Sequence, residues 1–308
     1  MWCSKNKILL TLCLLMTGIF CGAQYRPQYS QYMFNGMALN PAYVGCREVL
    51  SLATLYRSSQ WGKSVTGAPV TYTFSGDFPM KNPQLALGML IFDDAISIFR
   101  QTGAYFAYAF HVKTAEGTLS LGLQAGFDLH REDASRIILI DDDDPMFATR
   151  LFRSFMPNAG VGTFYYTKSF FVGLSLPQIL TYSPKGKDLY ESKPALSNTM
   201  LYGGYVIPAG NLLKIKPSTL IHYVGKGLLV DVNCIFSLLG DKFEVGVSWR
   251  NSTTLVAMTQ FRFQSFCLGY AYDYALNKPN ALNTSHELML RYELKYIVNA
   301  ANPLHYIK

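Results

Sequence analysis

The sequence predicts an all-β fold, a transmembrane antiparallel β-barrel of about 14 strands with a short amino-terminal periplasmic or plug segment. Apolar and polar residues alternate over long runs, as in Glu116–Arg131, where Leu121 and Leu123 alternate with Gly122 and Gln124. These runs are mostly about 10 to 14 residues long, whereas a globular strand averages five or six and a tilted transmembrane strand needs about 9 to 11. No apolar stretch of about 18 residues follows the first 23 residues, which excludes a helical membrane span.

The first 23 residues have the pattern of a signal peptide. Lysines precede an apolar run over residues 8–21, small residues occupy positions 21–23, and we predict cleavage before Gln24. A lipoprotein anchored through Cys21 is the alternative, which Phe20 disfavours because a small residue is expected there. Removal of two lysines lowers the formal net charge from +7 to +5, and the scattered basic residues do not form a nucleic-acid footprint.

We divide the mature chain into an aromatic and polar segment, residues 24–45, and an outer-membrane barrel, residues 46–308. The odd-to-even joints include two long interruptions, Glu132–Phe155 and Gln178–Ala195, while the even-to-odd joints are short. Short periplasmic turns and longer outer loops are typical of bacterial outer-membrane barrels. The predicted strands are 47–58, 67–77, 84–93, 101–113, 117–130, 156–167, 169–177, 196–208, 211–224, 227–239, 242–250, 253–263, 265–275 and 284–296.

Short motifs along the chain resemble those of one protein family. They are Gln31-Tyr32-Met33-Phe34-Asn35, Asn40-Pro41-Ala42-Tyr43 and Gly45, then Tyr56-Arg57, Gln60-Trp61 and Gly67-Ala68-Pro69, then Asp144-Pro145 and Phe147, then Phe171-Val172-Gly173-Leu174-Ser175 and Pro177, and finally Gly269-Tyr270, Tyr272-Asp273, Ser285-His286-Glu287, Leu290 and Tyr292. Together they resemble the PorP/SprF family of Bacteroidetes outer-membrane proteins over nearly the whole mature chain. Two departures are Gly36, where a proline is common, and the pair Ser58-Ser59 before Gln60.

The resemblance implies a non-enzymatic component of the type IX protein secretion and gliding-type machinery, located in the outer membrane. It implies contact with outer-membrane lipid and with periplasmic ring proteins of the lipoprotein PorK and PorN type, which the barrel would anchor or dock. No cofactor, nucleic acid or small-molecule substrate is expected. A passive outer-membrane porin or solute channel is the alternative. The candidate interaction residues are Gln31, Tyr32, Asn35, Asn40, Pro41, Tyr43, Asp144 and Pro145.

The segment Gln24–Gly45 is rich in aromatic residues but has no strand period. It could plug the lumen, dock periplasmic partners or run as a strap along the barrel rim, and the sequence leaves these three placements open. The run Asp141–Asp144 reads as a solvated outer loop, with a loosely held cation as the alternative, because it lacks the spaced ligands of a calcium loop. No histidine spacing indicates a metal site, and no G-x-S-x-G motif indicates a nucleophile.

Charged residues that we expect to face the lumen gather on the last six strands. They could pair across neighbouring strands, form a selective polar lumen or pack against a plug, and we favour pairing. The alternation also places Leu121 on the lipid face, Cys234 outward and Cys267 inward, which predicts no disulfide between these cysteines. The expected inward charges are Lys214, Lys216, Asp231, Glu244, Arg250, Arg262, Asp273, Glu287, Arg291 and Glu293.

Overall fold

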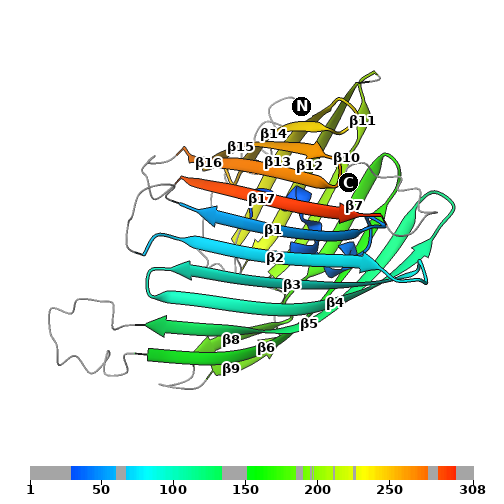
Figure 1. The fold of residues 1–308 in the computed structure, drawn as a ribbon. Helices are drawn as coiled ribbons and strands as arrows, with labels where there is room; N and C mark the ends of the chain where they lie inside the picture. Colours follow the sequence, from blue (N-terminus) through cyan, green and yellow to red (C-terminus); the bar gives the residue numbers. More distant parts are fainter. Residues whose placement is uncertain are drawn as a thin grey trace, which may run out of the picture.

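The computed structural model describes residues 29–59, 67–133, 151–184, 190–194, 196, 198–210, 212–224, 227–276 and 284–295. Within these residues, 14 strands form a closed antiparallel barrel (Figure 1), when β10 and β11 are taken as one interrupted strand. The strands are β1 Leu50–Ser58, β2 Val70–Pro79, β3 Leu85–Ile96, β4 Phe99–Lys113, β5 Thr118–Asp133, β6 Leu151–Tyr166, β7 Phe170–Leu176, β10 Asn198–Tyr205 with β11 Ile207–Pro208, β12 Leu213–Val224, β13 Gly227–Leu238, β14 Phe243–Arg250, β15 Thr254–Phe263, β16 Phe266–Ala275 and β17 Ser285–Leu294.

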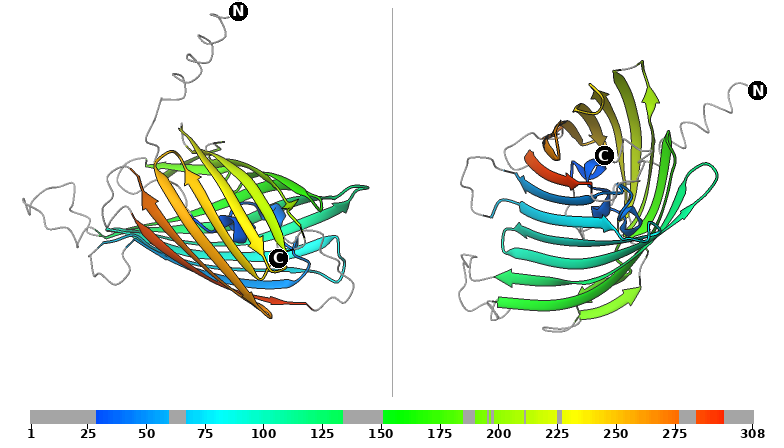
Figure 2. Two further views of the ribbon diagram at one scale, coloured as in Figure 1. Left: turned by 90° about the horizontal axis from the view of Figure 1, so that it is seen from above. Right: turned by 45° about the vertical axis from the view of Figure 1, so that its right-hand side comes forward.

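The barrel closes between its first and last strands. β1 pairs with β17 in an antiparallel register that places Thr54 opposite Leu290. On the far side, β10 pairs with both β7 and β12, so the sheet continues past the long connection after β7. Figure 2 shows the strands tilted around a common interior. The fold class and the strand number predicted from the sequence are therefore confirmed.

The period-two pattern sets which side chains leave the barrel. On β5, Leu121 is 47% exposed, whereas Gln124 is 5% exposed and points into the interior. Leu123 is also exposed, and Gly122 faces inward, so the predicted register of this strand is correct. Apolar side chains on the outer surface are what a barrel needs when lipid surrounds it.

Most strand boundaries differ from the predicted ones by one to three residues, and the larger differences have identifiable causes. β1 begins at Leu50 and not at residue 47, because Gly45 and Glu48 have positive φ angles that turn the chain just before the strand. β5 continues to Asp133 and β6 begins at Leu151, so both strands extend into the interruption predicted at Glu132–Phe155. Val206 breaks the predicted strand 196–208.

The interruption predicted at Gln178–Ala195 contains a hairpin that the sequence analysis did not identify. Its strands are β8 Leu180–Pro184 and β9 Tyr190–Pro194, which form a separate two-stranded sheet. The hydroxyl of Tyr182 donates to the carbonyl of Pro157 on β6. The amide of Asn158 donates to the carbonyl of Leu180 at 2.8 Å, which also holds this hairpin to the barrel wall.

The two ends of the barrel differ in their connections. At one end, which we call the short-turn end, the joints are residues 80–84, 114–117, 167–169, 209–212, 239–242 and 264–265. The opposite, long-loop end has the connections 59–69, 134–150, 177–197 and 276–284 together with short ones. The run Asp141–Asp144 and Pro145 fall on 134–150, outside the described residues, as does the predicted signal peptide. No helix in the described part of the chain has the length and apolar character needed to span a membrane.

Candidate functional site: a segment inside the barrel

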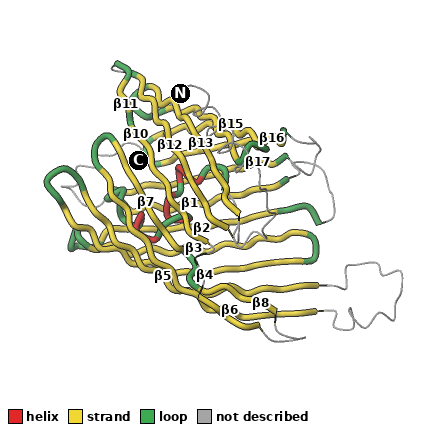
Figure 3. Tube along the Cα trace, turned by 180° about the vertical axis from the view of Figure 1, so that it is seen from behind, coloured by secondary structure: helices red, strands yellow, loops and turns green. Residues whose placement is uncertain are grey.

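Residues 29–49, which we call the lumenal segment, lie inside the barrel (Figures 2 and 3). The segment contains three short 3-10 turns, Tyr32–Phe34, Gly36–Ala38 and Pro41–Tyr43. It runs from Ser30, which contacts β16 and β17 near the long-loop end, to the start of β1 at the short-turn end. Of the three placements left open by the sequence, the structure has the segment in the lumen and not along the rim.

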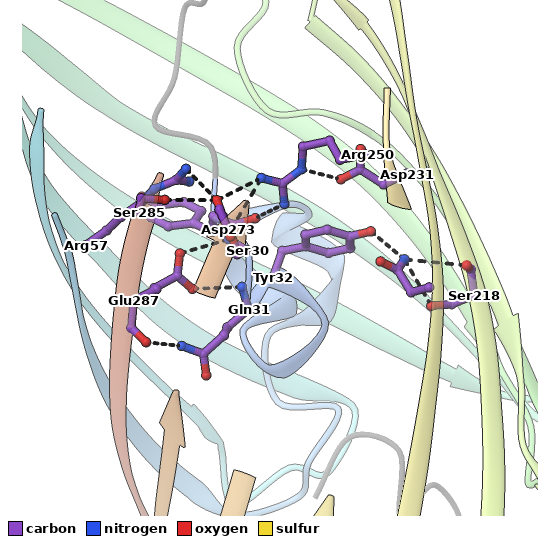
Figure 4. Close-up of polar contacts among 12 residues, drawn as sticks. Ser30, Gln31, Tyr32, Arg57, Ser218, Asp231, Arg250, Asp273, Ser285 and Glu287 are labelled. Atoms are coloured by element: carbon purple, nitrogen blue, oxygen red, sulfur yellow. Dashed lines mark hydrogen bonds and ion pairs between the residues drawn. The ribbon is translucent and has the colours of Figure 1, made fainter. Parts of the chain in front are cut away.

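Glu287 on β17 holds the first residues of the lumenal segment (Figure 4). One carboxylate oxygen accepts the backbone N–H of Ser30 at 2.8 Å, and the other accepts that of Gln31 at 2.7 Å. The side-chain amide of Gln31 donates to the carbonyl of Glu287 at 3.1 Å. All three residues are buried, so these charge-assisted hydrogen bonds lie away from water and fix the position of the chain.

Asp273 on β16 extends this network across the wall (Figure 4). It accepts hydrogen bonds from the hydroxyl of Ser30 at 2.6 Å and from Arg57 of β1 at 2.8 Å. Arg250 of β14 pairs with Asp231 of β13 at 3.0 Å and also donates to the carbonyl of Tyr29 at 3.2 Å. Charged groups on β14, β16 and β17 therefore bind this end of the lumenal segment directly, and Arg57 and Asp231 support them from β1 and β13.

Asn40 places the middle of the segment against β5 and β6. Its side-chain oxygen accepts the N–H of Ala42 at 2.8 Å, which caps the turn that Pro41 begins. Its amide group donates to the carbonyl of Thr163 on β6 at 2.9 Å. The hydroxyl of Ser120 on β5 donates to the carbonyl of Ala42 at 2.6 Å. The turn is thus bonded to both strands.

Two glycines of the wall make room for this turn. Gly122 and Gly162 lie directly opposite each other on β5 and β6. A Cβ atom at Gly122 would lie 2.1 Å from the backbone nitrogen of Ala42, and one at Gly162 would lie 2.0 Å from the side-chain oxygen of Asn40. Any larger side chain at either position would collide with the segment. We call this glycine pair the notch.

Aromatic residues cover the side of the segment that faces β6, β7 and β10. Tyr43 contacts Phe164 with ring centroids 5.5 Å apart, and Phe164 stacks on Tyr202 at 5.8 Å. Phe171 packs against both Phe164 and Tyr202. The lumenal segment therefore lies between charged side chains on β14–β17 and these aromatic side chains. The charged side chains bind polar groups of the segment, and the aromatic side chains pack against Tyr43.

The short-turn end has its own anchor. The guanidinium groups of Arg47 and Arg291 both donate to the carbonyl of Phe34. Asp77 on β2 accepts the N–H of Gly45 at 3.0 Å. These contacts fix the chain where it leaves the lumen and enters β1.

The candidate residues of the lumenal segment all come together in this site. Each of the six is buried within the barrel: Gln31, Tyr32, Asn35, Asn40, Pro41 and Tyr43. The other two candidates, Asp144 and Pro145, lie outside the described residues. Sequence reasoning missed the notch at Gly122 and Gly162, although two inward-facing glycines on neighbouring predicted strands were the available signal.

The charged residues that we expected to face the lumen do so. Some pair across the wall, as Lys216 does with Glu244 at 2.6 Å and Arg262 with Glu293 at 2.6 Å. Others bind the lumenal segment, as the contacts of Glu287, Asp273 and Arg291 demonstrate. Both pairing and packing against the segment therefore occur, whereas pairing alone was the favoured interpretation.

The cysteines were predicted to lie on opposite faces of the wall. Cys234 is partly exposed, Cys267 is buried and both are free, in agreement with the predicted orientations. In the described ranges of the chain, no group of three or more histidine, cysteine, aspartate or glutamate residues is arranged to hold a metal ion.

Comparison with known proteins identifies the chain. The family model described as type IX secretion system membrane protein PorP/SprF matches residues 21–292. No curated protein matches. Similar solved structures include the CymD monoaromatic hydrocarbon channel, with a TM-score of 0.47, 14% identity and coverage of 90% of this chain and 94% of that one. Omp33 of Acinetobacter baumannii has a TM-score of 0.44, 11% identity and coverage of 80% and 97%. The chain belongs to the PorP/SprF family of type IX secretion system membrane proteins and is a β-barrel of the outer membrane.

Proposed function

We propose that this barrel is a non-enzymatic structural component of the type IX secretion machinery that docks periplasmic ring proteins of the lipoprotein PorK and PorN type. The observation that carries the proposal is the lumenal segment, which is bonded to opposite walls of the barrel and to both of its ends. A barrel built for free passage of solutes does not need a buried segment held in this way. A filled barrel instead offers its outer surfaces for binding.

The docking surface that we propose is the short-turn end, because the motif residues of the lumenal segment are covered by the barrel wall. Short turns face the periplasm in bacterial outer-membrane barrels. Leu212 is 66% exposed and Leu239 is 60% exposed on two neighbouring turns there. The N–H of Leu239 donates to the carbonyl of Leu212 at 3.1 Å, so the two residues lie together. This exposed apolar pair is the feature of the short-turn end that we propose a partner covers.

Substitution of this leucine pair tests the docking proposal. Leu212→Asp with Leu239→Asp should leave the amount of folded barrel unchanged but release the periplasmic subunits that co-purify with it and reduce secretion of type IX cargo. Leu196→Asp is the matched control, because Leu196 is exposed in the connection at the opposite end. Normal partner recovery in the double variant would remove this surface from consideration.

The motif residues have a different expected role. The triple variant Tyr32→Ala, Asn35→Ala and Asn40→Ala leaves every barrel strand intact but removes contacts that hold the lumenal segment. We expect reduced secretion with near-normal barrel abundance. Normal secretion and normal partner recovery would place the functional surface elsewhere.

The alternative function, a passive porin, makes the opposite prediction for the purified protein. It requires steady open pores in a planar bilayer, whereas a docking component with a filled lumen should remain closed. The polar inner wall formed by Asp231, Glu244 and Asp273 is the feature that favours the porin, because aqueous channels are lined by such groups. Conductance of the wild-type chain therefore separates the two functions.

A further inference from the structure

Three arginines form a row on the outer surface of β4, β5 and β6. Arg100 lies opposite Arg131 in the β4–β5 register, and Arg131 lies opposite Arg153 in the β5–β6 register. Neighbouring strands are about 4.8 Å apart, so three like charges are directly adjacent. The side chains of Arg100 and Arg131 are 58% and 45% exposed, and Arg153 is exposed as well. Like charges directly opposite each other destabilise a sheet unless an anion compensates them.

The carboxylates of the barrel compensate this row only in part. Asp93 accepts from Nε of Arg100 at 2.9 Å. Asp133 lies 3.6 Å from a terminal nitrogen of Arg131, which is longer than a hydrogen bond. In the part of the chain that the structure describes, Arg153 has no ion pair. Terminal guanidinium nitrogens, which suit the oxygens of a phosphate group, are therefore available along the row.

Apolar residues lie directly beneath the arginine row. Leu129 on β5 and Phe155 on β6 are opposite each other, two residues from Arg131 and Arg153, and both are exposed on the outer face. The arginines and these two residues, together with Thr102, His130 and Ser154, line a hollow of about 570 Å³ at this end of the wall. Below Leu129, the outward positions of β5 continue as an apolar band. The row therefore marks the boundary where acyl chains give way to headgroups.

The leaflet follows from the fold. The arginine row lies at the long-loop end, because Arg131 and Arg153 flank the connection 134–150. Long loops of bacterial outer-membrane barrels face outward. The lipids at this level are those of the outer leaflet.

We propose that Arg100, Arg131 and Arg153 bind the phosphate of a phosphorylated glycolipid of the outer leaflet, whose acyl chains lie along Leu129 and Phe155. Guanidinium groups bind phosphate through paired N–H donors, and the apolar residues extend the contact to the chains of the same molecule. A free phosphate ion would use the arginines alone. The inference concerns the lipid-facing surface and does not depend on docking at the short-turn end.

Binding of purified lipid A to the full chain in detergent tests this site. Radiolabelled lipid A carrying its phosphates should bind the wild-type barrel roughly tenfold or more tightly than the same lipid with its phosphates removed, the ratio that loss of about 1.4 kcal/mol produces. Millimolar inorganic phosphate should not displace the lipid. Equal binding of the two lipids would overturn the proposal, and so would full displacement by inorganic phosphate, which would indicate a simple anion site.

The variant Arg131→Gln with Arg153→Gln should lose this preference for the phosphorylated lipid. Its matched control is Lys81→Gln with Lys168→Gln, which removes the same charge from exposed turns at the opposite end. Undiminished lipid binding in the arginine variant would overturn the proposal. If the arginine variant fails to fold, the comparison of the two lipids on the wild-type chain still decides the matter.

Discussion

Glu287 binds the backbone of Ser30, a residue 257 positions away in the sequence, and its second oxygen binds the next residue, Gln31. A carboxylate that accepts two consecutive backbone N–H groups fixes the position of the backbone, and this contact does not depend on the side chains of those two residues. The contact joins the last strand of the barrel to the first described residues of the lumenal segment. Loss of this carboxylate should therefore loosen the segment without altering any strand.

Glu287→Ala should raise the conductance of the purified barrel in a planar bilayer. Hydrogen bonds to a charged group contribute about 1.5 to 3 kcal/mol each, so loss of two should increase the population with a displaced segment by roughly a hundredfold or more. Glu287→Gln keeps one oxygen acceptor and should have an intermediate effect. Glu116→Ala, in an exposed turn, is the control and should behave as wild type. A closed, folded Glu287→Ala barrel would mean that the remaining contacts suffice to hold the segment.

The notch, on β5 and β6, allows a second test of how the lumenal segment is held in place. Gly122→Val places a branched side chain where a Cβ alone would lie 2.1 Å from the backbone of Ala42. Overpacking of this kind costs about 1 to 3 kcal/mol, so the temperature of the heat-modifiability transition should fall and conductance should rise. Ala125→Val lies on the same strand but faces outward, and it should alter neither measurement. Equal behaviour of the two variants would show that the notch does not position the segment.

The strands could be predicted because each one has its own alternation of apolar and polar residues. On β5, the alternation of Leu121 and Leu123 with Gly122 and Gln124 predicts a strand and shows which residues face the lipid and which face the lumen. This prediction needs no other part of the chain. The strand count followed from repeating this reasoning. The prediction failed for the hairpin β8–β9, because each of its strands has only five residues and ends in a proline, as loops often do.

The contacts of the lumenal segment could not be predicted, because they depend on residues that are distant in the sequence. The partners of Ser30 and Asn40 on the barrel wall are more than 100 residues away, and that of Asn40 on β6 is a backbone carbonyl, a group that every residue possesses. The aromatic content of the segment indicated that it is not a free tail, yet three placements satisfied that requirement. Only the closed barrel brings Glu287, Thr163 and Gly122 around the segment.

The arginine row illustrates a related limit. Each of Arg100, Arg131 and Arg153 is an outward residue near the end of its strand, which is unremarkable when one strand is considered alone. Their alignment depends on the register between strands, and that register is set by turns and by a connection lying between Asp133 and Leu151. A charge cluster that spans several strands can therefore be recognised only when the pairing of the strands is known.

Asp241, in the turn between β13 and β14, predicts how acid affects the short-turn end. Its carboxylate lies 2.6 Å from the ammonium group of Lys214 and 3.3 Å from that of Lys216. Burial opposes ionisation, but the positive charge of Lys216 and the hydrogen bonds from Lys214 and Ser237 outweigh it and lower the pKa of Asp241 to about 2. Because the folded pKa is lower than the usual aspartate value of about 4, the ionised group stabilises the fold above that value.

The stabilisation from Asp241 should be lost as the pH falls from about 4 to about 2, when the carboxylate is protonated in the folded protein. The heat-modifiability temperature of the wild type should therefore fall over this interval by more than that of Asp241→Asn, which lacks the titrating group but keeps a similar shape. At neutral pH the variant should already be less stable, since Lys216 is buried and loses a carboxylate partner. Asp133→Asn, at the long-loop end, is the control for general loss of negative charge. Parallel pH profiles for wild type and Asp241→Asn would contradict the assignment, because the difference between them isolates this one carboxylate.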